Sequence, residues 1–224
     1  AVQELLGAGE PTVESIAALQ LTSVPVRIMA GLLARRAAGA GAMTVLPCDN
    51  LPENGAALRR VVTDAAQATD PSLAEWMGEN IAWATSMVDR ITPATTDTEI
   101  SDVEKAQGYH DESPVPTEPF SEWVVSGEFP AGRPDWEASG VQIVEEVEAY
   151  EQRKLWMLNG SHSLMAYAGP ILGVETVAEG IAHPRLREIV QTWWQEAGPG
   201  LSVPWEDYAQ ALIDRYENPN IRHL

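Results

Sequence analysis

The segment from Lys154 to His162, with the sequence Lys-Leu-Trp-Met-Leu-Asn-Gly-Ser-His, places three chemically capable side chains within nine residues. Lys154 offers a proton acceptor, Asn159 offers an amide hydrogen-bond donor, and His162 offers an imidazole. Groups of these kinds are needed to handle a carbinol or a carbonyl. The segment is therefore the leading candidate for a catalytic site.

Helical geometry relates these three side chains to one another. On an α-helix, Asn159 and His162 share a face, whereas Lys154 lies about 140° from Asn159 and about 80° from His162. The helical rise separates Lys154 from His162 by about 12 Å, which a polyhydroxy chain could bridge. Alternatively, Lys154 extends towards solvent and Asn159-Gly160 marks a helix end. Spacing leaves both interpretations open, because a lysine base needs partial burial.

Other motifs carry less chemistry. The glycines of Ala38-Gly-Ala-Gly-Ala42 precede a predicted strand, whereas a dinucleotide fingerprint follows one, so they indicate a loop. Ser161 and His162 are adjacent and point about 100° apart on a helix, which argues against a nucleophile and its base. The histidines have no metal-ligand spacing, so no metal site is expected.

Composition narrows the class of protein. The net charge of −19, from 14 basic and 33 acidic residues, disfavours nucleic acid and anionic lipid as partners. No apolar run approaches the roughly 20 residues that span a bilayer, and no export signal is visible. The single Cys48 excludes an intrachain disulfide and fits a reducing compartment. We therefore expect a cytoplasmic metabolic protein.

The elements that must position the cluster form two parts. Residues 43–48 predict a buried strand, Asp49-Asn50 follow it, and a helix is expected over 54–68. A strand entering a helix through a polar turn is typical of α/β sheets, which bind ligands at the carboxyl ends of strands. Further strands are expected at 86–92, 120–125 and 141–147, and a loop with one short helix at 95–119. Helices are expected at 12–36 (broken at Pro25), 73–83, 150–168, 174–182, 184–197 and 205–216.

Six ordered blocks resemble one known family. They are Asp49-Asn50 after a strand, Asn54-Gly55, Ser86-Met-Val-Asp-Arg-Ile-Thr-Pro93, Glu118-Pro-Phe120, Gly132-Arg-Pro-Asp-Trp136 and Lys154-(x)4-Asn-Gly-Ser-His162. Together they are similar to the mannitol dehydrogenase family, the polyol-specific long-chain dehydrogenases. The resemblance implies an α/β fold class: residues 1–148 would form the C-terminal part of a Rossmann-type domain, and residues 149–224 would begin a mainly α-helical substrate domain.

The resemblance also implies a function and a set of roles. The activity would be a metal-independent, NAD-linked (or NADP-linked) interconversion of a secondary alcohol and a ketone, of the mannitol/fructose or mannonate/fructuronate type. Lys154 would be the acid/base, and Asn50 and Asn159 would donate hydrogen bonds to the developing alkoxide. His162 would orient a substrate hydroxyl. Asp89 would line the site, and Glu151 would gate proton passage to the lysine.

The sequence departs from the family pattern in one respect. The strand and glycine-rich turn that hold the cofactor pyrophosphate are expected upstream of the matching blocks, and a further substrate-binding segment is expected beyond Leu224. Asn50 is the one residue of this chain expected near the cofactor. A partner other than a small polyol or sugar acid is not indicated, and the oligomeric state stays open. The alternative is a non-catalytic binding or assembly module, which the absent phosphate loop favours and the intact site residues oppose.

Overall fold

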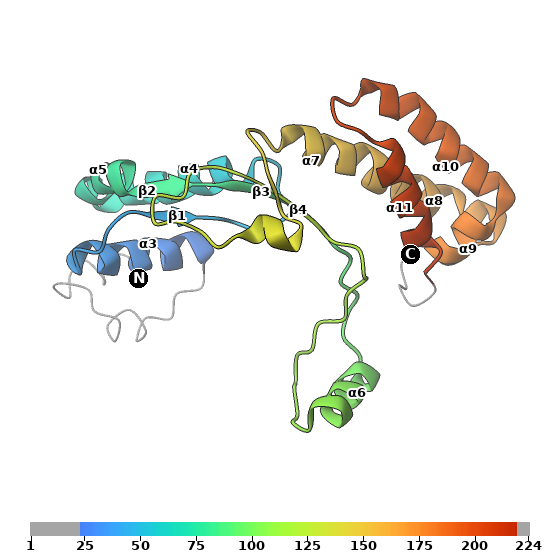
Figure 1. The fold of residues 1–224 in the computed structure, drawn as a ribbon, viewed down its shortest axis with the longest axis horizontal. Coiled ribbons are helices and arrows are strands. Elements are labelled where there is room, and N and C mark those ends of the chain that lie inside the picture. Colours follow the sequence, from blue (N-terminus) through green and yellow to red (C-terminus); the bar gives the residue numbers. More distant parts are fainter. Residues whose placement is uncertain (1–22, 219–224) are drawn as a thin grey trace. The chain divides into compact units, whose positions relative to one another are not determined.

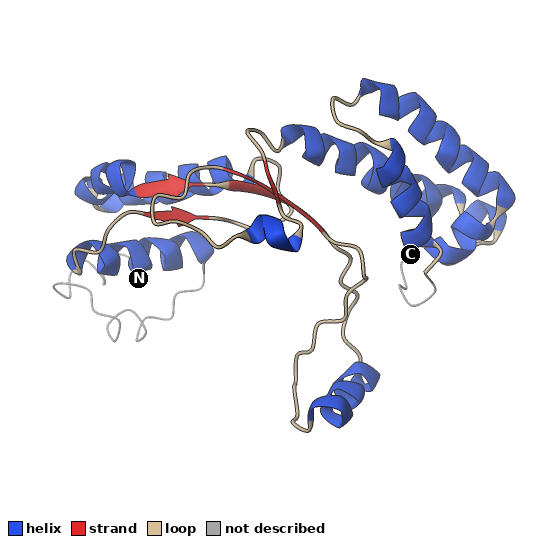
Figure 2. Ribbon diagram, in the orientation of Figure 1, coloured by secondary structure: helices blue, strands red, loops and turns tan. Residues whose placement is uncertain are grey.

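The computed structural model describes residues 23–218, which form parts of two compact units, each with its own hydrophobic core. Of the described residues, 23–87 and 124–147 belong to unit 1, and 88–123 and 148–218 belong to unit 2. The elements of each unit can be followed by colour in Figure 1 and by type in Figure 2. Within residues 23–218, no helix has both the length and the apolarity that a membrane crossing needs.

Unit 1 is built from helices and short parallel strands. Its first elements are α3 (Val24–Ala37), β1 (Met43–Val45), α4 (Asn54–Thr69), α5 (Pro71–Asn80) and β2 (Ile81–Trp83). Strands β1 and β2 pair in parallel, with Met43 opposite Ile81. The core is formed by buried side chains of the three helices and of β2, including Met29, Val62 and Leu73. Burying one face of each helix stabilises this unit.

A second sheet follows along the chain. It consists of β3 (Thr85–Asp89), β4 (Glu122–Ser126) and β5 (Gln142–Ile143), in the order β3-β4-β5. Strands β4 and β5 pair in parallel, with Val124 opposite Gln142. The 3-10 helix η1 (Trp136–Ser139) lies between them in sequence. Strands β3 and β4 each run from one unit into the other, so Asp89 at the end of β3 belongs to unit 2.

Unit 2 is mainly helical. Its elements are α6 (Asp97–Gln107), α7 (Glu148–Lys154), the π-helical turn η2 (Leu155–Asn159), α8 (Gly160–Ala168), η3 (Pro170–Leu172), α9 (Val177–Ala182), α10 (Pro184–Ala197), η4 (Gly198–Gly200) and α11 (Glu206–Tyr216). Side chains of η2 and α8 to α11 form the core, among them Met157, Ile181, Trp194 and Leu212. A capping box of Thr176 and Glu179 begins α9.

The predicted order, mixed α/β followed by mainly helix, is confirmed. The helix predicted over 184–197 has those bounds. The helix predicted over 73–83 was wrong at its end: it stops at Asn80, and residues 81–83 form β2 because they pair with β1, a partner distant in sequence. Helix α3 begins at Val24 after an extended Ser23 and has Pro25 in its first turn, which agrees with a helix that starts at the expected break. The helix expected before that break falls in residues 12–22, outside the described part. The domain boundary near residue 148 stays a prediction.

Candidate active site

Lys154 is the last residue of α7 and is half-buried. Partial burial is what a lysine base needs, and the sequence alone could not show it. Its Nζ donates a hydrogen bond to the carbonyl oxygen of Val88 at 2.7 Å. Burial lowers the pKa of the Lys154 ammonium from its ordinary value of 10.5, although the negative charge of Asp89 opposes this shift. The hydrogen bond to Val88 and the partial burial argue against the alternative in which Lys154 extends its ammonium group towards solvent. A lysine with a lowered pKa is suited to acid/base chemistry.

Asp89, next in the chain to Val88, is buried in a network of charges. Its Oδ1 accepts a hydrogen bond from Arg215 Nη2 at 2.8 Å, and its Oδ2 accepts one from Arg215 Nη1 at 2.9 Å. The Tyr208 hydroxyl also donates to Oδ2, at 2.5 Å. Asp89 is 2% exposed. Although burial alone lowers the pKa of Arg215, its hydrogen bonds to Asp89 and Glu118 raise it above its usual range. Asp89 thus binds Arg215 and Tyr208, and its proposed contact with substrate stays a prediction.

Glu118 completes the network. Arg215 donates to both of its carboxylate oxygens, from Nε at 2.9 Å and from Nη2 at 2.8 Å. The Ile91 amide donates to Glu118 Oε1 at 2.7 Å, and the Arg90 guanidinium donates to the Glu118 carbonyl. A guanidinium that serves two buried carboxylates satisfies charges that would be costly alone. The segment after β3 and the segment before β4 are thereby held to α11.

Arg153 anchors the residue immediately before the lysine. It is buried, and its Nη2 donates to Glu122 Oε1 at 2.6 Å while Nη1 donates to the Pro204 carbonyl at 3.0 Å. Its guanidinium also lies 4.5 Å from the centre of the Tyr208 ring. These contacts fix the end of α7, and with it the origin of the Lys154 side chain.

The π-helical turn η2 changes the relation between Lys154 and Asn159. The Gly160 amide donates to the Leu155 carbonyl, five residues back, as a π-helix requires. A π turn holds more residues than an α-helical turn, so Lys154 and Asn159, five residues apart, lie closer in angle here than on an α-helix. The expected separation of about 140° applies to an α-helix and not to this turn. Gly160 has φ −61° and ψ −51° and continues into α8. The interpretation of Asn159-Gly160 as a helix end was therefore wrong.

The remaining predicted residues lie in two places. Glu151 is half-buried on α7, one turn before Lys154, and His162 is half-buried in the first turn of α8. Asn50 is exposed in the loop after β1 and belongs to unit 1, whereas the other predicted residues belong to unit 2. The structure thus collects Glu151, Lys154, Asn159 and His162 along one helical segment, with Asp89 beside Val88.

Sequence reasoning missed several residues that support the site. Tyr208 and Arg215 gave no local signal, because their partners lie more than 90 residues away in the chain. Asn54 is buried in unit 1, where its amide donates to the Ser86 carbonyl at 2.8 Å and to the Asp49 carbonyl at 3.0 Å. The Ser86 amide donates back to Asn54 Oδ1 at 3.0 Å. Asn54 therefore braces the loop that carries Asn50.

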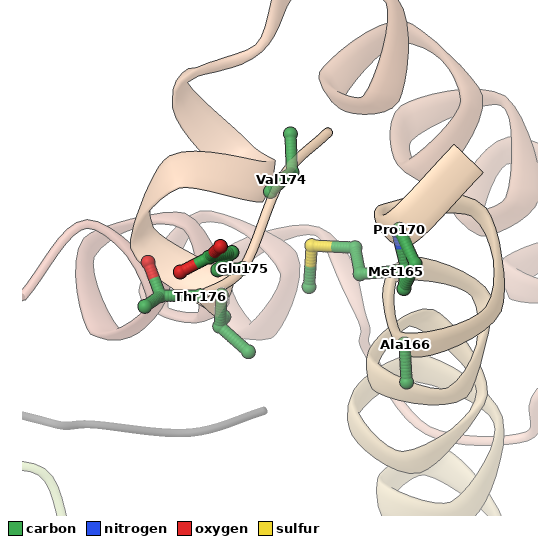
Figure 3. A pocket seen from close by; sticks show the side chains of 7 residues that line it. Met165, Ala166, Pro170, Val174, Glu175 and Thr176 are labelled. Atoms are coloured by element: carbon green, nitrogen blue, oxygen red, sulfur yellow. The ribbon is translucent and has the colours of Figure 1, made fainter. Parts of the chain in front are cut away.

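One small cavity lies away from these groups. Its lining includes Met165 on α8, Pro170, and the segment Val174–Val177 before and at the start of α9. Figure 3 shows the Met165 thioether and Val174 beside it. The lining is mostly apolar and holds none of the predicted site residues, so this cavity does not change the assignment.

Comparison with known proteins gives a consistent result. The family model of the mannitol dehydrogenase Rossmann domain matches residues 2–138, and that of the mannitol dehydrogenase C-terminal domain matches residues 146–224. The chain is 44% identical to an uncharacterized oxidoreductase, YdfI, of Escherichia coli strain K12. It is 42% identical to the D-mannonate oxidoreductase of the same strain. Each match covers 88% of this chain and 41% of the relative. The chain spans about two fifths of the length of these curated relatives.

A solved structure agrees. The ternary complex of Pseudomonas fluorescens mannitol 2-dehydrogenase with NAD and D-mannitol superimposes with a TM-score of 0.75 at 37% identity, covering 88% of this chain and 41% of that one. The predicted fold class, a Rossmann-type part followed by a helical part, is confirmed by these matches. With both family models matched in order along one chain, the protein belongs to the mannitol dehydrogenase family.

Proposed function

We propose that this chain carries the acid/base site of an NAD-dependent dehydrogenase that interconverts a secondary alcohol and a ketone of a polyol or sugar acid. The observation that carries the proposal is the half-buried Lys154, whose pKa is lowered by burial and which a π-helical turn joins to Asn159. The activity named for its relatives, on mannitol or mannonate, supports the substrate class.

Lys154 takes the hydroxyl proton in oxidation and returns it in reduction. A lowered pKa makes the neutral amine easier to reach, and an amine that can both take up and release a proton serves proton transfer in either direction. Its hydrogen bond to the Val88 carbonyl orients Nζ without neutralising it. Glu151, one turn earlier on the same helix, passes the proton between the lysine and solvent.

Asn159 stabilises the oxygen from which the proton leaves, and Asn50 stays the predicted second donor. Two amide donors aimed at one oxygen form a small oxyanion hole, worth roughly 3–4 kcal/mol per donor in other enzymes. His162 orients a neighbouring hydroxyl of the substrate. The Asp89–Arg215 pair supports the Val88 carbonyl on which Lys154 rests, and Asp89 borders the substrate.

The cofactor fits unit 1 at the end of β1. Asp49 and Asn50 follow a strand of a parallel pair and are exposed, and ligands of α/β sheets lie at the carboxyl ends of strands. Asn50 would lie by the nicotinamide end. Bound NAD supplies the hydride acceptor and donor. The choice between NAD and NADP, and a cytoplasmic location, stay predictions.

Two measurements test the proposal. The chain has two lysines, Lys105 and Lys154, so reductive methylation with labelled carbon gives two assignable lysine signals in NMR spectra. We expect the Lys154 signal to titrate below 10.5, with Lys105→Arg as the assignment control. We also expect saturable NADH binding and ketose-dependent NADH oxidation that is lost in Lys154→Ala and kept in Lys105→Ala.

The outcomes separate the two candidate functions. Retained turnover in Lys154→Ala contradicts the assignment of the base. Absence of any NADH response in tryptophan fluorescence and calorimetry, for the protein as expressed from its gene, supports the alternative of a non-catalytic binding or assembly module.

A further inference from the structure

The π register of η2 needs support from outside the helix. A single π turn is less favourable than continued α-helix and is found mostly at functional sites. In the α-helical register the Gly160 amide would donate to Trp156, four residues back. Here it donates to the carbonyls of Leu155 and Met157 instead. The Trp156 carbonyl therefore does not receive the amide that an α-helix would give it.

Side chains from two distant helices donate to three consecutive carbonyls of this turn. Trp193 Nε1 on α10 donates to the Trp156 oxygen at 2.8 Å, and Trp194 Nε1 donates to the Met157 oxygen at 2.9 Å. Tyr216 on α11 donates from its hydroxyl to the Leu158 oxygen at 2.9 Å. The turn thus has a row of external donors along its carbonyl side.

Two of the three donors are buried. Trp194 and Tyr216 are buried in the core of unit 2. Ser161 Oγ, on the first turn of α8, lies 2.5 Å from the Met157 oxygen and 2.9 Å from the Tyr216 hydroxyl, linking the helix to α11. Tryptophan and tyrosine combine a large packed ring with one directed donor, so they can place that donor without much loss of entropy.

Gly160 makes room for this arrangement. An added Cβ there would lie 2.9 Å from Trp193 Nε1 and 3.0 Å from its Cζ2. The glycine has ordinary helical dihedral angles, so its role is to admit the indole and not to turn the chain. The hydrogen bond from Trp193 to Trp156 thus depends on the absence of a side chain at position 160.

We infer that Trp193, Trp194 and Tyr216 are positioning residues that hold η2 in its π register and so keep Lys154 and Asn159 closer in angle than an α-helix would place them. The inference rests on the proposed function, in which both side chains meet one substrate oxygen. Reversion to the α-helical register would return the two residues to about 140° apart. The base and the amide donor would then no longer reach the same atom.

The test removes single donors while keeping the rings. Tyr216→Phe deletes the hydroxyl bond to Leu158, and Tyr167→Phe on exposed α8 surface is the matched control. We expect Tyr216→Phe to lower kcat about 10- to 100-fold with KM changed less than about 3-fold, since misplacement by about 1 Å costs on that order. Trp193→Phe, at a partly exposed site, provides a second variant should Tyr216→Phe not fold.

A double-mutant cycle with Asn159→Ala distinguishes positioning from general destabilisation. If Tyr216 acts through Asn159, its loss lowers kcat little once Asn159 is gone. Additive losses, or an unchanged kcat in folded Tyr216→Phe, overturn the inference. An unchanged kcat in Asn159→Ala alone overturns the proposed oxyanion donor instead. Amide hydrogen exchange at Asn159 and Gly160 tests the support of η2 without measuring turnover. We expect faster exchange in Tyr216→Phe than in Tyr167→Phe, and equal exchange in the two variants would contradict the inference.

Discussion

Replacing Gly160 by alanine is expected to destabilise the protein, against the usual effect of this change in a helix. Glycine in a helix interior is worse than alanine by about 0.5–1 kcal/mol, so the change normally stabilises. At Gly160 the new Cβ would lie 2.9–3.1 Å from three atoms of the Trp193 indole, closer than the 3.4–4 Å of ordinary contact. The indole must therefore retreat by roughly half an ångström from the helix.

That retreat sets the magnitude. It weakens the hydrogen bond from Trp193 to the Trp156 carbonyl, worth about 0.5–1.5 kcal/mol, and it strains the packing around the ring by about 1 kcal/mol or more. After subtracting the intrinsic gain, we expect Gly160→Ala to lower the free energy of unfolding by about 1–2 kcal/mol. Gly31 in α3 is the matched control, because a Cβ there meets nothing within 4 Å. We expect Gly31→Ala to raise the same quantity by about 0.5–1 kcal/mol.

Urea unfolding, followed by circular dichroism and tryptophan fluorescence, measures both changes. In a Trp193→Ala background, where the indole is gone, the penalty of Gly160→Ala should vanish and become a gain. If Gly160→Ala in the parent chain raised the free energy of unfolding as much as Gly31→Ala does, the argument that Gly160 makes room for Trp193 would be refuted.

Three further predictions concern the residues that support the site. Asn54→Ala should lower the free energy of unfolding by about 2–3 kcal/mol, because it leaves the buried amide and carbonyl of Ser86 without their partner; an equal urea midpoint would contradict this. Arg215→Met should cost about 3–5 kcal/mol by leaving two buried carboxylates uncompensated, and a loss below about 1 kcal/mol in the same assay would show that the network is dispensable. The pKa of Lys154 in the folded protein is lower than its ordinary value of 10.5, which applies to the unfolded chain. At a pH between the folded and the unfolded pKa, the unfolded chain binds more protons than the folded one, so the free energy of unfolding rises with pH. The free energy of unfolding of the parent chain relative to Lys154→Met should therefore increase from pH 7 towards pH 10.5, and a difference that falls with pH would reverse the sign of the argument.

Local patterns determined a large part of this protein. The helix at 184–197 was predicted with its observed bounds because its periodicity and its N-terminal proline are local signals. The strand after residue 43 and the helix beginning at Asn54 were predicted for the same reason. The cluster of Lys154, Asn159 and His162 was also visible in the sequence, since it depends on residue type and order alone.

The tertiary structure decided how that cluster is arranged. No local rule places a π turn after Lys154, because the donors that compensate it come from residues 37 to 58 positions further along the chain. Burial of Lys154 likewise depends on β3 and α11, which meet only in the folded unit. A sequence states which groups are present, whereas hydrogen bonds and desolvation act through space. The π turn between Lys154 and Asn159, and the lowered pKa of the lysine, are therefore properties of the fold.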